Sequence, residues 1–122
     1  YEEYKNTDLQ FMVRHPAGWT VETSRSGSGT EEIFFVGLVG EAERLNISVL
    51  SETMEGLVRN SLTIDSEKSL TIDGVPATKL IGKSLKDGSP YSVVLVKRAG
   101  RLYSISGTGR AFEQIQDNFQ LL

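Results

Sequence analysis

Three short turns in the second half of the chain restrict its fold more than any other feature of the sequence. They fall at Asp73-Gly74, at Lys86-Asp-Gly-Ser89 and at Arg98-Ala-Gly100. Asp-Gly is a dipeptide favoured in type I′ hairpin turns, and the segments 75–85, 91–97 and 101–106 carry the apolar pattern of strands. Connections this short join only antiparallel neighbours, because a parallel pair needs a crossover of about a dozen residues. The second half is therefore predicted to form an antiparallel meander.

The first half of the chain shows a similar strand pattern. Residues 11–21 alternate apolar with polar side chains on both sides of a turn at Pro16, which removes a backbone donor and favours extended geometry before it. The small polar residues 23–30 predict a loop, and the segments 33–39 and 45–49 predict two further strands, the first of them central because it is apolar on both faces.

Two amphipathic helices are predicted from apolar residues at helical spacing. The first begins near Glu52, and its stripe consists of Met54, Leu57, Val58 and Leu62. The stripe of the second consists of Phe112, Ile115 and Phe119, although residues 119–122 also fit a short final strand. Strands, a helix, strands and a helix in this order predict an α+β fold.

The size and charge of the chain exclude several classes of protein. Its 122 residues, of which 39% are hydrophobic, fit one globular domain, and no apolar run approaches the ~20 residues that span a bilayer. The net charge of -3 argues against a nucleic-acid binder, because neutralising phosphates requires an excess of Lys and Arg. The chain has no cysteine, which excludes disulfides, zinc–thiolate sites and cysteine nucleophiles from it.

The charge is distributed unevenly along the chain. Residues 1–73 carry 13 acidic and 6 basic side chains, whereas residues 74–122 carry 3 acidic and 7 basic ones. Such asymmetry can orient a partner by electrostatic steering, although two solvated halves that offset each other give the same counts. The sequence starts at Tyr1 rather than Met, which predicts a processed or trimmed chain.

Short motifs along nearly the whole chain resemble those of PsbP-like domains. Tyr4, followed by Phe11-x-Val13 and by Pro16-x-Gly18-Trp19, resembles the strand and turn with which these domains open. Asp73-Gly74-Val75-Pro-Ala77 is similar to the start of their long strand, and Gly100-Arg-Leu-Tyr103-Ser-Ile105 to a later strand. The closing helix is also similar, with Asn118-Phe119 where the family has Ser-Phe.

The resemblance implies a curved antiparallel sheet of about six or seven strands, flanked by two or more helices in an α/β/α sandwich, with residues 1–122 as one domain. PsbP-like proteins include the extrinsic protein of the plant oxygen-evolving complex, a nuclear-import factor that binds a Ran GTPase, and bacterial envelope lipoproteins. The resemblance therefore implies a non-catalytic protein-binding or assembly-assisting module without a cofactor. It also implies an extracytoplasmic location, in a bacterial cell envelope or secreted, with a lipid anchor upstream of this sequence.

Basic side chains near two of the turns are the first candidate contact surface. Lys97, Arg98 and Arg101 gather at one predicted hairpin tip, and Lys83 and Lys86 at the preceding one. They could dock an acidic partner or anionic lipid headgroups, although charges at the ends of a sheet also serve solubility alone. The turn from Arg14 to Trp19 is a second candidate contact, with Trp19 as an interface anchor or as a core residue.

Residues able to support catalysis or metal binding are sparse. His15 is the only histidine, and a metal site around it would need carboxylates such as Glu31 or Glu32 that nothing in the sequence places nearby. The chain has no G-x-S-x-G elbow. The run from Gly107 to Arg110 before the second helix resembles an anion-binding turn, with a plain helix start capped by Thr108 as the alternative. The chain is accordingly expected not to be an enzyme, and no metal site is assigned.

The alternative function is that of a carrier or sensor of a small ligand, held between the sheet and a helix. Tyr91 and Tyr103 are the candidate polar and aromatic lining of that pocket. A carrier requires an apolar cavity of at least ~300 Å³, whereas a protein-binding module requires an exposed surface and no deep pocket.

Overall fold

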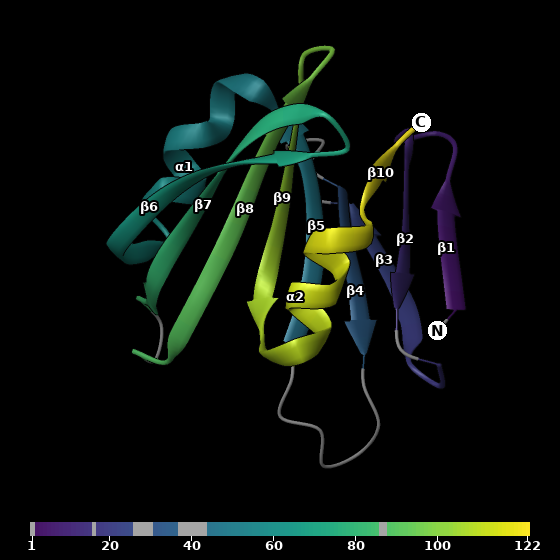
Figure 1. The fold of residues 1–122 in the computed structure, drawn as a ribbon, viewed down its shortest axis with the longest axis horizontal. Helices are drawn as coiled ribbons and strands as arrows, with labels where there is room; N and C mark the ends of the chain where they lie inside the picture. The colour runs from purple at the N-terminus through teal and green to yellow at the C-terminus, as the bar shows by residue number, and fades with distance from the viewer. Residues whose placement is uncertain (1, 16, 26–30, 37–43, 86–87) are drawn as a thin grey trace.

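A computed structural model of the protein describes residues 2–15, 17–25, 31–36, 44–85 and 88–122 (Figure 1). The elements follow one another as β1 (Glu2–Asn6), β2 (Phe11–His15), β3 (Thr20–Arg25), β4 (Glu31–Val36), β5 (Arg44–Ser51), the 3₁₀ turn η1 (Glu52–Met54), α1 (Glu55–Arg59), β6 (Leu62–Ile72), β7 (Val75–Ser84), β8 (Pro90–Arg98), β9 (Arg101–Thr108), α2 (Gly109–Asn118) and β10 (Gln120–Leu121).

Seven strands form one antiparallel sheet in the order β3-β4-β5-β9-β8-β7-β6. The predicted meander of the second half, β6 to β9, forms one side of this sheet, and β3 to β5 form the other. The two halves join where β5 pairs with β9 in an unbroken register from Arg44–Thr108 to Ser51–Arg101. The predicted fold class, an antiparallel α+β sheet of about six or seven strands, is confirmed.

Two of the three predicted turns lie within the described residues, and both have type I′ geometry. Asp73 and Gly74 have φ of 51° and 78°, and Ala99 and Gly100 have φ of 53° and 79°. Positive φ at both central residues defines a type I′ turn, whose twist matches the twist of the flanking strands. Of the third turn, Lys86 and Asp87 lie outside the described residues.

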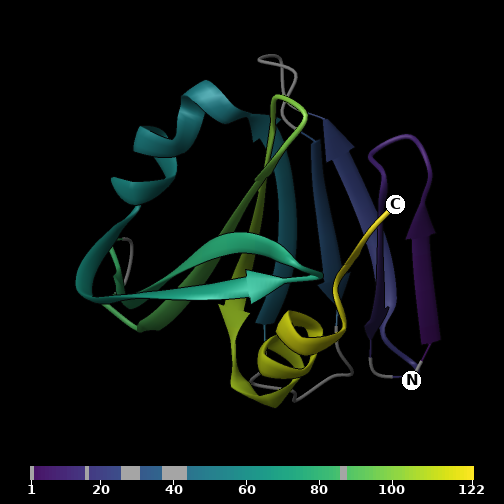
Figure 2. The ribbon, with the colours of Figure 1, turned by 45° about the horizontal axis from the view of Figure 1, so that its top comes forward.

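The main core lies between one face of this sheet and a cover made by α2 and a second sheet, β1-β2-β10 (Figure 2). We call this side the α2 face. Its buried side chains are Leu9, Phe11, Val13, Trp19, Leu45, Ile47, Val49, Ile72, Ala77, Val94, Val96, Tyr103, Ile105, Phe112, Ile115 and Phe119. The aromatic rings of Phe11, Tyr103 and Phe119 pack together at its centre, with centroids 5.5 to 6.0 Å apart.

The opposite face of the large sheet carries a smaller core that, within the described part of the chain, is covered by η1 and α1, and we call it the α1 face. Its buried side chains are Leu50, Leu62, Leu80, Val93, Leu95 and Leu102, against which Met54, Val58 and Tyr91 pack. Neighbouring residues of β8 such as Val94 and Leu95 belong to different cores, because successive side chains of a strand point to opposite faces. Helices on both faces give the predicted α/β/α layering.

The first predicted helix is shorter than its apolar stripe suggested. α1 ends at Arg59, so Leu62 begins β6 rather than closing the helix, and Leu57 is 62% exposed rather than buried. The helical spacing of Leu62 was misleading, because Leu62 packs in the α1 core from the first position of β6 and not from the helix. The strand prediction, in turn, missed most of β6, because only Leu70-Thr-Ile72 shows the expected pattern, while the side chains from Thr63 to Ser69 are all exposed.

The two ends of the chain meet in the second sheet. β10 pairs with β2, which confirms the short final strand as the better prediction for residues 119–122, and α2 contains the predicted Phe112 and Ile115. β1 was not predicted: its side chains are exposed or half-buried, so its sequence lacks a strong apolar alternation. β9 also continues through Thr108, beyond the strand end predicted at Ser106.

Candidate functional site

The predicted basic cluster is divided between the two faces of the sheet. Lys97 follows Leu95 and Val93 on the α1 face. Arg98 follows Val96 on the α2 face, and it lies directly opposite Arg101 in the register of β8 and β9. The one cluster is therefore an Arg98–Arg101 pair on one side and a separate Lys97 on the other, because adjacent residues of a strand alternate.

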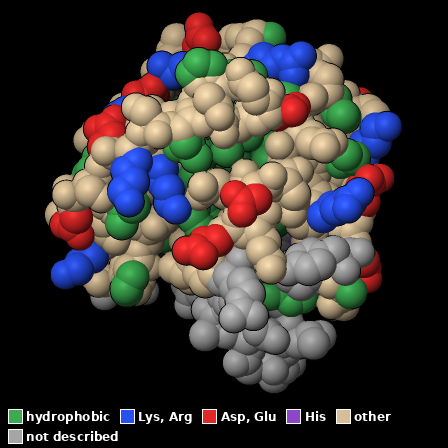
Figure 3. All heavy atoms as spheres, in the orientation of Figure 1, with side chains coloured by type: hydrophobic (Ala, Val, Ile, Leu, Met, Phe, Trp, Pro, Cys, Tyr) green, Lys and Arg blue, Asp and Glu red, His purple; other side chains and the backbone are tan. Residues whose placement is uncertain are grey.

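The Arg98–Arg101 pair reaches solvent, and its charge is not compensated by any of the described residues. Arg98 is exposed and Arg101 half-buried, and neither forms an ion pair with any residue that the structure describes. On the face seen in Figure 3, basic and acidic side chains are interspersed rather than gathered in one broad basic surface. The positive charge at this turn is therefore a local feature of the two arginines.

The other predicted basic residues lie elsewhere. Successive turns of a meander fall at opposite ends of the sheet, so the β7–β8 connection, with Lys83 near it, lies at the far end from the β8–β9 turn (Figure 1). Lys86 lies outside the described residues. The expectation that both tips act together is therefore not supported by the arrangement of the strands.

Trp19 and Arg14 do not form a joint contact surface. Trp19 is 6% exposed and belongs to the main core, which removes it as an interface anchor. Arg14 is exposed on β2, in the other sheet, and its backbone N–H donates to Asn118 Oδ1 at 2.9 Å while its carbonyl accepts from Asn118 Nδ2 at 3.0 Å. These two bonds attach the C-terminal end of α2 to β2 and give Arg14 a structural role.

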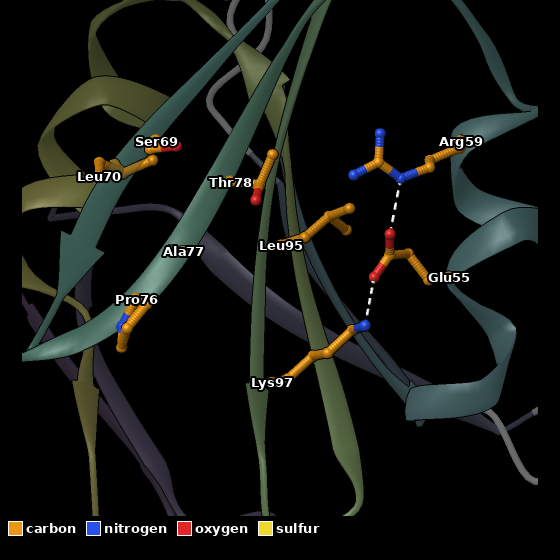
Figure 4. Close-up of a pocket in the computed structure, with 9 residues that line it drawn as sticks. All are labelled: Glu55, Arg59, Ser69, Leu70, Pro76, Ala77, Thr78, Leu95 and Lys97. Atoms are coloured by element: carbon orange, nitrogen blue, oxygen red, sulfur yellow. Dashed lines mark hydrogen bonds and ion pairs between the residues drawn. The ribbon is translucent and has the colours of Figure 1, made fainter.

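Lys97, by contrast, belongs to a chain of ion pairs that attaches α1 to the sheet (Figure 4). Its Nζ lies 2.5 Å from Glu55 Oε1, and Glu55 Oε2 lies 2.7 Å from Arg59 Nε. Arg59 Nη2 then lies 3.0 Å from Glu67 Oε1 on β6. The two cations and two carboxylates alternate, so the chain is electrically balanced.

These contacts move the pKa values of the central pair. Hydrogen bonds from Lys97 and then from Arg59 lower the pKa of Glu55, and hydrogen bonds to Glu67 and then to Glu55 raise the pKa of Arg59. Both shifts favour the charged forms, as expected for groups whose charges are partnered. The sequence analysis missed this network, although Glu55 and Arg59 stand at the i, i+4 spacing of a helical ion pair.

Beside the network lies an open hollow of about 290 Å³ between α1 and the strands β6, β7 and β8 (Figure 4). Its apolar lining is Leu70, Pro76, Ala77 and Leu95, and its polar lining is Glu55, Arg59, Ser69, Thr78 and Lys97. The side chain of Leu95 belongs to the α1 core, whereas those of Leu70 and Ala77 pack in the α2 core on the opposite face of the sheet, so the apolar side chains on the α1 side of the hollow are those of Leu95 and Pro76.

Beside the hollow, β7 and β8 part near their ends. Their pairing stops at Ala77–Val96, although β7 begins at Val75 and β8 continues to Arg98. Pro76 has no N–H to donate to a ladder, and the tip of the β6–β7 hairpin is held toward the α2 face by a 3.0 Å bond from Leu121 N–H to Asp73 Oδ2.

Tyr91 and Tyr103 do not line a common pocket. Tyr103 is 1% exposed in the α2 core, and its hydroxyl donates to the Leu9 carbonyl at 2.6 Å. Tyr91 packs on the α1 core, on the other side of the sheet. The sheet separates the two rings, so the predicted shared lining is corrected.

The other residues that the sequence offered for metal or anion binding are His15, Glu31, Glu32 and Thr108. His15 is 3% exposed at the end of β2, across from Glu2, and no group of three or more metal-ligating side chains occurs among the described residues. The side chains of Glu31 and Glu32 are not among those described. Thr108 occupies the N-cap position of α2, but its side chain makes no capping hydrogen bond. None of the described helices is long and apolar enough to cross a membrane.

Comparison with known proteins identifies the architecture. No family model matches the chain, and no curated protein matches its sequence. The solution structure of cyanobacterial PsbP (CyanoP) from Synechocystis sp. PCC 6803 superposes with a TM-score of 0.72, covering 99% of this chain and 92% of that chain at 13% sequence identity. The expected architecture is thereby confirmed, and the chain has a PsbP-like fold.

Proposed function

We propose that this protein is a non-catalytic protein-binding or assembly-assisting module of the cell envelope, and that its β8–β9 turn docks on an acidic surface of the partner. The proposal rests on one observation: Arg98 and Arg101 face each other at an exposed turn without a counter-ion among the described residues. A PsbP-like fold, which hosts protein-associated modules, supports the general class. The site at the turn supports the chemistry of the partner.

Two local costs at this turn support a binding role. Like charges directly opposite each other on neighbouring strands are destabilising. Ala99 holds a φ of 53°, which for a residue with a side chain costs about 1 kcal/mol more than for glycine. An anionic group bound between the guanidinium groups would offset the first cost, and arginine is well suited to carboxylates because its planar fork donates two parallel hydrogen bonds.

The alternative, a carrier of a small ligand, has less support. It required an apolar cavity between the sheet and a helix, lined by Tyr91 and Tyr103, and those residues lie on opposite faces. The hollow beside α1 is open and partly lined by charged side chains. An open surface of this kind fits a segment of a partner protein better than an enclosed ligand.

Charge reversal at the turn tests the proposal. The double variant Arg98→Glu/Arg101→Glu should lower the capture of the partner from an envelope extract of the native cells at least about tenfold at low salt, because it replaces attraction by repulsion. The matched control is Lys5→Glu/Lys68→Glu, which makes the same change in net charge at exposed positions of β1 and β6. Equal capture by both variants would refute a docking role for the turn.

A further inference from the structure

We infer that the hollow beside α1 is a second contact site, which binds the carboxylate of an acidic side chain from a partner protein. The site lies on the α1 face, whereas the Arg98–Arg101 pair lies on the α2 face, so it goes beyond the docking proposed for the β8–β9 turn and does not depend on it. The inference is supported by the donors that converge on the hollow, by their surplus over the acceptors and by the apolar surface between them.

Hydrogen-bond donors converge on the hollow from four separate elements (Figure 4). α1 supplies Arg59, and β8 supplies Lys97. Ser69 of β6 pairs with Thr78 of β7, which pairs in turn with Leu95 of the α1 core. Directly opposite residues of paired strands share a face, so both hydroxyl groups lie on the α1 face. Cationic and hydroxyl groups therefore reach one space from segments that are distant in sequence.

The two cations retain donors that their ion pairs do not use. Within the described part of the chain, the ammonium group of Lys97 contacts only the carboxylate of Glu55. The guanidinium group of Arg59 uses Nε for Glu55 and Nη2 for Glu67. Each of these cations carries more N–H groups than these contacts engage, so both can donate to a further acceptor.

The group that satisfies these donors must bring acceptors. Both oxygens of Glu55 are already engaged by cations, and the hydroxyls of Ser69 and Thr78 form no hydrogen bond with any other described residue. An ionised carboxylate only accepts, and hydrogen bonds between charged groups are stronger than those between neutral ones. A carboxylate bound between Lys97 and Arg59 would share both cations with Glu55, so Glu55 competes with it for them.

The size and open shape of the hollow favour a protein side chain over a free small acid. Leu95 and Pro76 supply apolar surface on this side of the sheet, against which the methylene groups of an acidic side chain can lie. The volume of about 290 Å³ corresponds to about ten water molecules at ~30 Å³ each, which is room for one side chain. Because the hollow is open, a free acid would stay largely in solvent, whereas a partner protein adds contacts outside it.

Titration of ¹⁵N-labelled protein with capped peptides tests the inference. The peptide Gly-Gly-Glu-Gly-Gly should shift the amide resonances of Ser69, Thr78 and Leu95. Its counterpart with Gln should bind there about tenfold more weakly, because a neutral acceptor replaces a charged one. Equal affinity of the two peptides at these resonances would refute a carboxylate site. Free acetate should bind more weakly than the Glu peptide, and equal binding would overturn the assignment to a protein side chain.

Two charge variants test the position of the carboxylate. Glu55→Gln removes the group that competes for the cations, so the affinity of the Glu peptide at the hollow should rise about fivefold. An unchanged or lower affinity would contradict a carboxylate between Lys97 and Arg59. Lys97→Met keeps the aliphatic chain but removes a cation, and should lower that affinity about tenfold. The control Lys68→Met makes the same change on the α2 face and should leave the affinity unaltered.

A third variant leaves the ion pairs that hold α1 in place. Thr78→Val replaces a hydroxyl by a methyl group of the same shape and should lower the affinity of the Glu peptide about threefold. Thr63→Val makes the same substitution at an exposed position of β6 outside the hollow and serves as the control. If Lys97→Met and Thr78→Val both bind the peptide as the unchanged protein does, the inference is refuted.

The positions of the shifted resonances separate this inference from the proposed function. The Glu peptide also reports on the β8–β9 turn, through the resonances of Arg98, Gly100 and Arg101. Shifts at the hollow alone would support the carboxylate site and refute docking at the turn, and shifts at the turn alone would do the reverse. Arg98→Glu/Arg101→Glu should abolish only the shifts at the turn, and loss of both sets would overturn the claim of two independent sites.

Discussion

The two described type I′ turns of this protein have the same backbone and opposite surroundings. At the β6–β7 turn, Ile72 and Val75 flank the central residues and pack on the main core, and Asp73 accepts a hydrogen bond from Leu121. At the β8–β9 turn, Arg98 and Arg101 flank the central residues instead, and an alanine occupies the strained first position.

The difference indicates that the β6–β7 turn serves the stability of the fold and that the β8–β9 turn serves binding. At the first turn, the turn residues, the flanking pair and the tertiary contacts all favour the same structure, as expected for a position selected for folding. At the second, two local preferences are violated without compensation from any described residue. The backbone there is held by other contacts, such as the 3.1 Å bond from Glu52 N–H to the Gly100 carbonyl. Sites where local rules fail in this way are candidates for binding, and the following predictions test that contrast.

The largest effect is expected at the turn that supports folding. Ile72 is 3% exposed, so Ile72→Ala should lower the free energy of unfolding by about 3 kcal/mol through lost burial and a residual cavity. Urea denaturation followed by circular dichroism measures it. The exposed neighbour Thr71, changed to Ala, should leave stability almost unaltered. A loss below about 1 kcal/mol for Ile72→Ala would remove the claim that this turn is anchored by the core.

The strained position of the second turn should respond in the opposite direction. Ala99→Gly should raise the free energy of unfolding by about 1 kcal/mol, because glycine adopts positive φ without steric cost. The equivalent substitution in the first turn, Asp73→Gly, should lower stability, since it removes the acceptor for the Leu121 N–H. The comparison between the turns breaks down if both glycine variants change stability in the same direction.

Charge reversal of a single arginine should stabilise the fold and weaken binding together. Arg98→Glu places a carboxylate opposite Arg101, and the new cross-strand pair should contribute about 0.5 kcal/mol to stability. The same variant should reduce capture of the acidic partner. Thermal denaturation at low and high salt checks the first effect, because the gain from the pair should shrink as salt screens it. A variant that is less stable and binds normally would contradict both statements.

An effect of about the same size as that of Arg98→Glu is expected from the ion pairs that attach α1 to the sheet. The pKa of Glu55 is lowered in the folded protein by its hydrogen bonds with Lys97 and Arg59. Its contribution to stability is therefore present above the unfolded pKa, near the usual value of 4.5, and is lost as the pH falls through the lower folded value. Because the group is partly exposed, we expect about 0.5 kcal/mol.

The pH dependence of Glu55→Gln tests this assignment. The difference in unfolding free energy between the unchanged protein and the variant should be present at pH 7 and should diminish below the usual pKa of a glutamate. Glu113→Gln, at an exposed position of α2, should show no such difference and serves as the control. A difference that does not change with pH would mean that the ion pairs contribute nothing measurable.

Local chemistry made much of the fold predictable. Asp73-Gly74 predicted a turn with positive φ, the short connections predicted antiparallel pairing, and the closing apolar stripe predicted α2. Each of these depends on a few neighbouring residues, so the sequence alone contains the relevant physics. β6 escaped prediction for the converse reason: an exposed edge strand is held by its pairing with β7 and needs no apolar alternation of its own.

The candidate site was likewise predictable from the sequence only in part. The sequence predicted a basic cluster of Lys97, Arg98 and Arg101 at one hairpin tip, and the structure divides it between the two faces of the sheet. Only the tertiary structure decided that Lys97 meets a counter-ion in Glu55 while the Arg98–Arg101 pair meets none among the described residues, and that β7 parts from β8 beside them. Those outcomes depend on contacts between segments distant in sequence, because the charge balance and the open space at a site are set by every element that packs around it.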